Sequence, residues 1–197
     1  MLSHAVLAVV LTGQVLAQRP STAPAQPSAS ACAGDADTHL ARLRGDGHTL
    51  LRAIRSNDTK TILDFFGDSV SLGADHLLTH SDVEQQLTSK SGIVYVTLFD
   101  TARLKALVAG TVVETTETTG RTDVAAHIRS LHDYFVEAER VAIDVQAIDD
   151  IPRTETTPLW ALLSFRWRER PPKGVYDDPI FVCTRAGWKF ATFFNVP

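Results

Sequence analysis

The chain has 197 residues, enough for one ordinary domain plus additional segments at ~100–200 residues per domain. Apolar residues make up 44% of it and charged residues 21%, a globular composition that excludes an intrinsically disordered chain. The formal net charge of −4, without any cluster of Lys or Arg, argues against a nucleic-acid-binding protein and against a polybasic membrane-surface protein.

The first 17 residues have the pattern of a secretion signal. Ala5–Leu16 is a mostly apolar run, and the small residue Ala17 offers a cleavage site before Gln18. The run is shorter than the ~20 apolar residues that span a bilayer. We therefore predict that residues 1–17 are a signal peptide, that the protein is exported to the periplasm or secreted, and that no membrane span remains after processing. An uncleaved anchor and a short apolar leader on a cytosolic protein are the alternatives.

Residues 18–36 are rich in Pro, Ser and Ala, and this composition predicts a disordered linker before a single domain at residues 37–197. Of the two cysteines, Cys32 lies in the linker and Cys183 in a predicted strand. An exported chain can form a disulfide between them. The interpretation we favour is a mobile thiol at Cys32 and a small buried apolar residue at Cys183. A lipid anchor on Cys32 is disfavoured, because Cys32 lies far beyond the apolar run.

The first half of the domain carries helical patterns. A short helix at His39–Leu43 should be interrupted by Gly45 and Gly47. Helical spacing resumes at Leu50–Ile54, ends at Ser56–Asn57–Asp58, and returns in a second short helix at Thr59–Phe66 that is followed by an extended piece at Val70–Gly73.

The middle of the chain alternates between predicted helices and strands. Ser81 and Glu84 have the spacing of a capping box, which predicts a helix from Asp82 to Ser89. The β-branched and aromatic run Gly92–Phe99 predicts a strand, with a buried helix as the alternative because the run is continuously apolar. Apolar residues at helical spacing then predict a long amphipathic helix at Asp123–Glu139, and an alternating pattern predicts a strand at Arg140–Ile148.

The last third of the chain predicts antiparallel strands. Every second residue from Leu159 to Trp167 is apolar, which is the repeat of a strand with one buried face. Ile180–Val182 and Trp188–Phe194 repeat this pattern on either side of Ala186–Gly187, a dipeptide suited to a tight hairpin. Helices followed by strands indicate an α+β fold, with the N-terminal helices packed on a curved antiparallel sheet.

Both ends of the domain resemble a known superfamily. The segment 50–58 (LLRAIRSND), with Ile62–Phe66 and Val70–Gly73 after it, is similar to the opening of NTF2-like (SnoaL-like, cystatin-like roll) domains, which begin with a helix, an Asn/Asp hinge, a short helix and a strand. The segment 186–194 (AGWKFATFF) is similar to their final hairpin. The resemblance implies a sheet wrapped around a cone-shaped cavity, in a family of isomerases, cyclases, dehydratases and non-catalytic binding modules. Fold alone does not choose among these functions.

An isomerase-type site needs a carboxylate base in an apolar cavity and a donor that faces the developing oxyanion. Tyr95 and Asp100 could supply this pair. The interpretation we favour is that Tyr95 is a core residue and that Asp100 caps the segment after it.

Histidines offer weaker candidates. His76 and His80 have a zinc-binding spacing, but they fall in a predicted loop and no third ligand is identifiable. His127 and His132 lie near Asp133, where a general base would still lack a nucleophile. We therefore expect no metal and no cofactor.

A positive stripe is the candidate for ligand binding. Arg166 and Arg168 lie on one predicted strand face and could bind an anion together with Lys189, with Trp160 beside them. Exposed charges that discourage edge pairing explain the same arginines.

The sequence favours a non-catalytic module that binds a small ligand or a protein partner, with homodimerisation through the open sheet face as a further expectation. The alternatives are an isomerase or lyase that acts on a small apolar carbonyl compound, and a tethered structural protein of the cell envelope.

Overall fold

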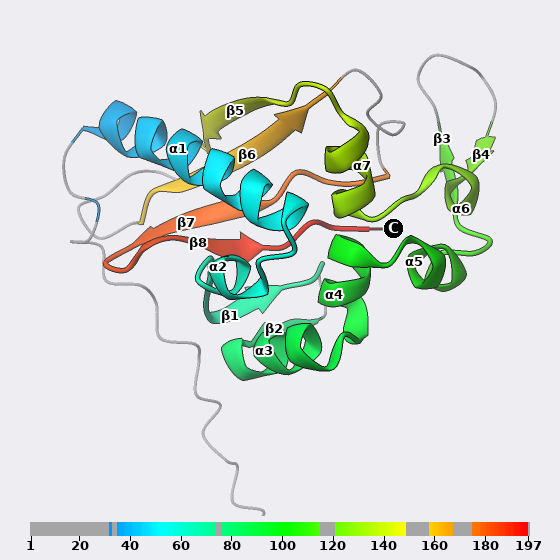
Figure 1. The fold of residues 1–197 in the computed structure, drawn as a ribbon. Helices are drawn as coiled ribbons and strands as arrows, with labels where there is room; N and C mark the ends of the chain where they lie inside the picture. The colour runs from blue at the N-terminus through cyan, green and yellow to red at the C-terminus, as the bar shows by residue number, and fades with distance from the viewer. Residues whose placement is uncertain are drawn as a thin grey trace, which may run out of the picture.

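A computed structural model describes residue 32 and residues 35–73, 76–114, 121–148, 158–167 and 175–196. The predicted signal peptide lies outside the described residues, as does the predicted linker except for Cys32, Asp35 and Ala36. The described residues form an α+β fold in which the N-terminal helix packs on a six-stranded, mostly antiparallel open sheet (Figure 1), as the sequence predicted.

Helices fill most of the first two thirds of the domain. They are α1 (Ala36–Arg55), α2 (Thr59–Leu63), α3 (His80–Ser89), α4 (Gly92–Phe99), α5 (Thr101–Leu107), α6 (Val124–His127) and α7 (Leu131–Glu137). The main sheet contains β1 (Phe66–Ser71), β2 (Leu77–Thr79), β5 (Ala142–Ala147), β6 (Trp160–Arg166), β7 (Ile180–Thr184) and β8 (Gly187–Thr192). A separate hairpin pairs β3 (Val112–Glu114) with β4 (Arg121–Asp123).

The strands of the main sheet lie in the order β2-β1-β8-β7-β6-β5. Neighbours pair antiparallel except β1 and β8, which are parallel. The predicted strands of the last third are confirmed, as is the hairpin: Gly187 has φ +98°, a conformation that glycine adopts without a Cβ penalty. The central position of β8 explains why the C-terminal segment is so apolar.

Helix α1 lies across one face of β5 and β6 (Figure 1) and is continuous, so the predicted interruption at Gly45 and Gly47 is wrong. A Cβ on Gly47 would lie 2.9 Å from Leu163 Cδ1 and 3.0 Å from Ile143 Cγ2. Gly47 is therefore a point of close helix–sheet approach, and the packing that it permits offsets the low helix propensity of glycine.

Phenylalanine rings from β1, β7, β8 and the segment after β8 pack against one another. Phe190 is central: its ring centroid lies 4.8 Å from that of Phe66, 4.5 Å from that of Phe181 and 5.5 Å from that of Phe193. Such offset and edge contacts are the favoured geometries of aromatic pairs.

The predicted strand at Gly92–Phe99 is wrong, and its alternative, a buried helix, is correct. Gln86 explains this outcome, because its side-chain oxygen accepts a hydrogen bond from Val94 N at 3.0 Å and so satisfies an amide in the first turn of α4. Burial among other helices then outweighs the β propensity of the valines, as tertiary context often does.

The predicted helix at Asp123–Glu139 is also wrong in its continuity. This segment begins in strand β4 and continues as α6. The helix ends at Ile128, whose ψ of 139° is extended. Ser130 then caps α7 by accepting a hydrogen bond from Asp133 N. The apolar stripe was read correctly, since Val124, Ile128, Leu131 and Phe135 are all buried.

Helix α3 begins earlier than predicted. Its capping box consists of Thr79 and Asp82 rather than Ser81 and Glu84, and both reciprocal hydrogen bonds are present. Thr79/Asp82 and Ser81/Glu84 are both three residues apart, as a capping box requires, and the sequence does not distinguish the two pairs.

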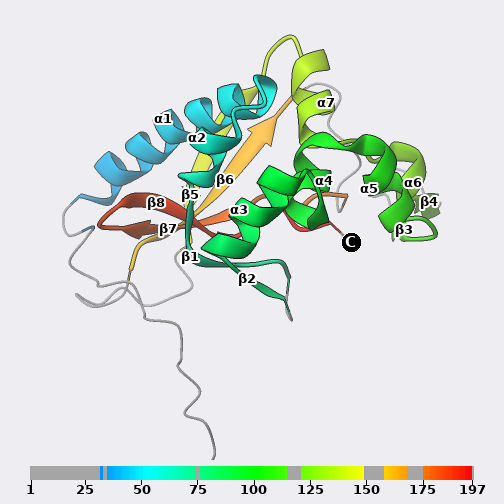
Figure 2. The ribbon, with the colours of Figure 1, turned by 60° about the horizontal axis from the view of Figure 1, so that its bottom comes forward.

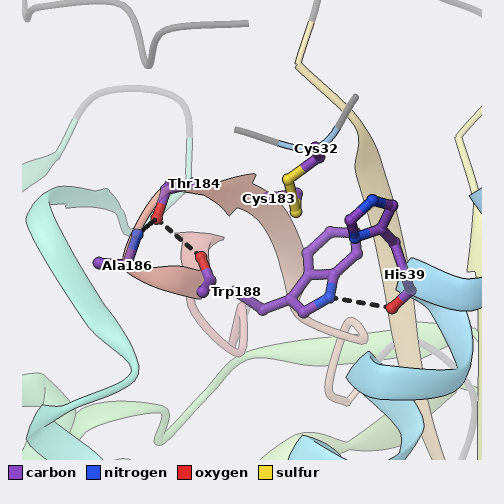
Figure 3. Close-up of a disulfide and its surroundings, with 7 residues drawn as sticks. Cys32, His39, Cys183, Thr184, Ala186 and Trp188 are labelled. Carbon is purple, nitrogen blue, oxygen red and sulfur yellow. Dashed lines mark hydrogen bonds between the residues drawn. A yellow bond between two sulfur atoms is a disulfide. The ribbon is translucent and has the colours of Figure 1, made fainter. Parts of the chain in front are cut away.

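Cys32 and Cys183 form a disulfide, contrary to the free thiols that we favoured (Figure 3). Their Cα atoms lie 6.2 Å apart, within the range of disulfides. The bond attaches the segment before α1 to β7.

Within the described ranges, none of the helices has the length and apolar character needed to cross a membrane.

Candidate functional site

An apolar pocket of about 590 Å³ lies between α4, α5 and the C-terminal end of the chain. These three segments are close together in both Figure 1 and Figure 2. Six of the eight residues that line it are aliphatic, and the other two are a glycine and an arginine: Gly92, Ile93, Val96, Arg103, Ala106, Leu107, Val108 and Val196. This volume lies within the ~300–1,000 Å³ that is typical of small-molecule sites.

The junction of α3 and α4 fixes one wall of the pocket. Lys90 has a left-handed φ of +53°, and Gly92 has φ +77°. A Cβ on Gly92 would overlap the side chain of Gln86, which is held by its bond to Val94 N. Only glycine therefore suits the first position of α4, where it brings the apolar face of Ile93 and Val96 to the pocket.

Arg103 is the one charged residue among those that line the pocket. Asp100 caps α5 by accepting a hydrogen bond from Arg103 N at 2.9 Å, and it pairs with Arg103 Nε at 3.3 Å. Arg103 Nη1 donates to Lys90 O at 2.9 Å. These contacts use Nε and one proton of Nη1, out of five guanidinium donors. The guanidinium is thus held in position beside an apolar surface and retains donors for a ligand.

The capping role expected of Asp100 is confirmed, and Tyr95 is half-buried against Phe99, with ring centroids 5.3 Å apart. The described contacts do not join Tyr95 to Asp100. A catalytic pair of these two residues stays a prediction, and full turnover in an Asp100→Asn variant of any activity found would exclude it.

Thr101, His132 and Asp133 form a polar cluster between α5 and α7. Thr101 Oγ1 donates to Asp133 Oδ2 at 2.6 Å and accepts from Ser130 N at 2.8 Å, and His132 Nδ1 lies 3.2 Å from Asp133 Oδ1. Burial raises the pKa of Asp133, but hydrogen bonds from Thr101 and His132 outweigh burial and hold the pKa below its ordinary value. The hydrogen bond donated by the Thr101 hydroxyl thus goes to the Asp133 carboxylate. The cluster joins two helices.

Trp160 and Arg166, which were predicted to bind one ligand on the sheet, lie far apart on β6. Trp160 is half-buried at the start of β6, and Arg166 is six residues further along the strand, roughly 20 Å away at ~3.3 Å per residue. Arg166 Nε forms an ion pair at 3.6 Å with Oδ2 of Asp144 on the neighbouring strand β5. Lys189, on β8, donates to Asp64 O, and Arg168 lies outside the described residues. Binding by this set stays a prediction.

The remaining histidine candidates lie apart from the pocket. His76 is exposed just before β2, and His80 begins α3 rather than lying in a loop. His127 is exposed at the end of α6.

Sequence reasoning missed the pocket. The feature that could have revealed it is the apolar run Gly92–Phe99, which is followed by Asp100 and Arg103 at the boundary between two helices. Reading the run as a strand hid this boundary between two helices and the apolar face beside Arg103.

Comparisons of the chain with protein-family models, with curated proteins and with solved structures found no match.

Proposed function

We propose that this protein is a non-catalytic binding module, and that the pocket between α4 and α5 holds a small amphipathic ligand with an apolar body and one anionic group. The observation that carries the proposal is the combination of an aliphatic pocket of about 590 Å³ with a single positioned guanidinium, that of Arg103. An apolar body would fill the pocket, and a carboxylate would accept from the remaining Arg103 donors.

Two further features support binding rather than catalysis. The pocket beside α4 and α5 is lined by aliphatic side chains, and Arg103 is the one charged residue among them. Asp100, the carboxylate nearest to Arg103 in sequence, already caps a helix and pairs with that arginine. In this role Asp100 orients a binding residue.

The proposal includes membership of the NTF2-like superfamily. In its support, α1, α2 and β1 follow one another as that family's opening does, and Asn57 between the two helices has φ +54°. The chain also closes with the hairpin β7–β8.

Export to an oxidising compartment is the second part of the proposal. The Cys32–Cys183 bond supports it, because structural disulfides persist mainly in exported proteins. Fractionation of cells that express the full chain tests it: mature protein in the periplasm or medium is expected, and membrane-bound protein would instead favour the envelope tether.

Calorimetric titration tests the ligand class. Decanoate should bind the full chain more tightly than decanol does, and a decyl ammonium should bind most weakly, since only the carboxylate pairs with Arg103. Arg103→Gln should lower the affinity for decanoate at least tenfold and leave that for decanol nearly unchanged. Arg129→Gln removes a surface arginine that pairs with Glu137 and is the matched control. Equal affinity of the three ligands, or an equal loss in both variants, would contradict the proposal.

A further inference from the structure

Three metal-ligating side chains converge at the N-terminal end of α1. The ligand atoms of Cys32, His39 and Cys183 all lie within 4.8 Å of one another. Figure 3 shows the His39 imidazole beside the two sulfur atoms. Cys183 is buried, and Cys32 and His39 are half-buried. The three come from different parts of the chain: the segment before α1, the first turns of α1, and β7.

The fold holds His39 and Cys183 in position independently of the disulfide. Cys183 on β7 is paired in register with Trp188 on β8. The Trp188 indole Nε1 donates to His39 O at 3.1 Å, which fixes the first turns of α1 over this strand pair. Asp35 caps the helix by accepting from Asp37 N and Thr38 N. Two of the three ligands thus keep their backbone positions when the sulfur–sulfur bond is absent.

We propose that reduction of the disulfide opens a Zn²⁺ site made of Cys32, His39 and Cys183, with water as the fourth ligand. Two thiolates and one imidazole are a recurring donor set for zinc. At Zn–S bonds of about 2.3 Å, tetrahedral geometry separates the two thiolates by about 3.8 Å. With Cα atoms 6.2 Å apart, rotation of the two cysteine side chains can open this separation, and an imidazole nitrogen of His39 lies within 4.8 Å of both sulfur atoms.

Reduction converts the disulfide to two thiols. A phosphine donates two electrons to the disulfide and becomes a phosphine oxide with an oxygen from water, and the two protons of that water yield two thiols. Zn²⁺ binding then displaces both thiol protons. In the oxidised protein both sulfur atoms are bonded to each other and neither is a thiolate. The same residues are therefore a covalent link under oxidising conditions and a metal site under reducing conditions.

Co²⁺ and Zn²⁺ titrations of the full chain test the site. The chain has only these two cysteines, so any thiolate signal comes from them. After reduction with a phosphine and its anaerobic removal, Co²⁺ should produce a sulfur-to-cobalt charge-transfer band that Zn²⁺ abolishes at one equivalent. The oxidised protein should show no band. His39→Ala should weaken Zn²⁺ binding at least tenfold, and the matched control His48→Ala, an exposed histidine of the same helix, should not.

Reformation of the disulfide is a second readout that does not depend on the cobalt spectrum. Zn²⁺ should slow the oxidation of reduced wild type and His48→Ala at least tenfold, and that of His39→Ala much less. If the reduced chain unfolded, any of its seven histidines could bind and the two variants would behave alike, which would overturn the proposal. Absence of the charge-transfer band in reduced wild type would also overturn it.

Discussion

Gly45 and Gly47 lie on the same helix in opposite environments, and this contrast makes the packing of α1 testable. A Cβ on Gly45 meets no atom within 4 Å, whereas one on Gly47 would lie 2.9 Å from Leu163 Cδ1 and 3.0 Å from Ile143 Cγ2. Leu163 and Ile143 are both buried, so neither can move into solvent. The comparison isolates the contact between α1 and the sheet.

The expected magnitudes follow from two opposing effects. Replacing glycine by alanine inside a helix stabilises it by about 1 kcal/mol at either position. At Gly47 the added methyl group also overpacks the core, which costs about 1–3 kcal/mol. Gly45→Ala should therefore raise the free energy of unfolding by about 1 kcal/mol. Gly47→Ala should leave it unchanged or lower it by up to about 2 kcal/mol.

Urea denaturation followed by circular dichroism measures both variants, provided that the slope with denaturant stays that of the wild type. Because the helix-propensity effect is common to both, the difference between the two variants reports the overpacking alone. An equal stabilisation by both substitutions would refute the close approach of α1 to β5 and β6.

Three further predictions concern the rest of the domain. Cys32→Ser removes a cross-link between residues 151 apart in sequence. It should lower the free energy of unfolding by about 2–5 kcal/mol, measured by urea denaturation under oxidising conditions. An unchanged denaturation midpoint would contradict the disulfide. Thr101→Val removes two hydrogen bonds between α5 and α7 and should cost about 1–3 kcal/mol in the same assay. Burial raises the pKa of Tyr134 to about 12 in the folded protein. The unfolded chain therefore loses the tyrosine proton at a lower pH than the folded chain does, and the free energy of unfolding should fall between pH 10 and pH 12. In urea denaturation measured at several pH values, Tyr134→Phe should make the decrease in the free energy of unfolding with pH shallower. An unchanged decrease would contradict the raised pKa of Tyr134.

The sequence predicted the sheet better than the helices. Strands form where Leu159–Trp167 and Trp188–Phe194 predicted them, as β6 (Trp160–Arg166) and β8 (Gly187–Thr192), because one face of each strand is buried and the alternation is unambiguous. The stripe in Asp123–Glu139 predicted burial correctly but missed a break, since Ile128 is buried although its backbone is extended. The continuity of α1 depends on a close contact at Gly47, which helix propensity does not reveal.

The candidate sites depend on specific contacts, between residues eight apart in one case and 151 apart in the other. Helix α4 forms because the Gln86 side chain binds the amide of Val94, and no local pattern shows this pairing. Likewise, Cys32 and Cys183 are brought together by the docking of α1 on the sheet. Asp100 is the exception: a cap at the end of an apolar run was predicted, and the carboxylate takes that role.

Photolabelling tests the central claim, the ligand pocket between α4 and α5, most directly. A long-chain carboxylate that carries a diazirine near its end should attach, on irradiation of the full chain, to peptides containing residues 92–108 or Val196. Excess decanoate should suppress this labelling, and Arg103→Gln should reduce it. Labelling mainly of β6 around Trp160, or labelling that decanoate does not suppress, would contradict the pocket as the binding site.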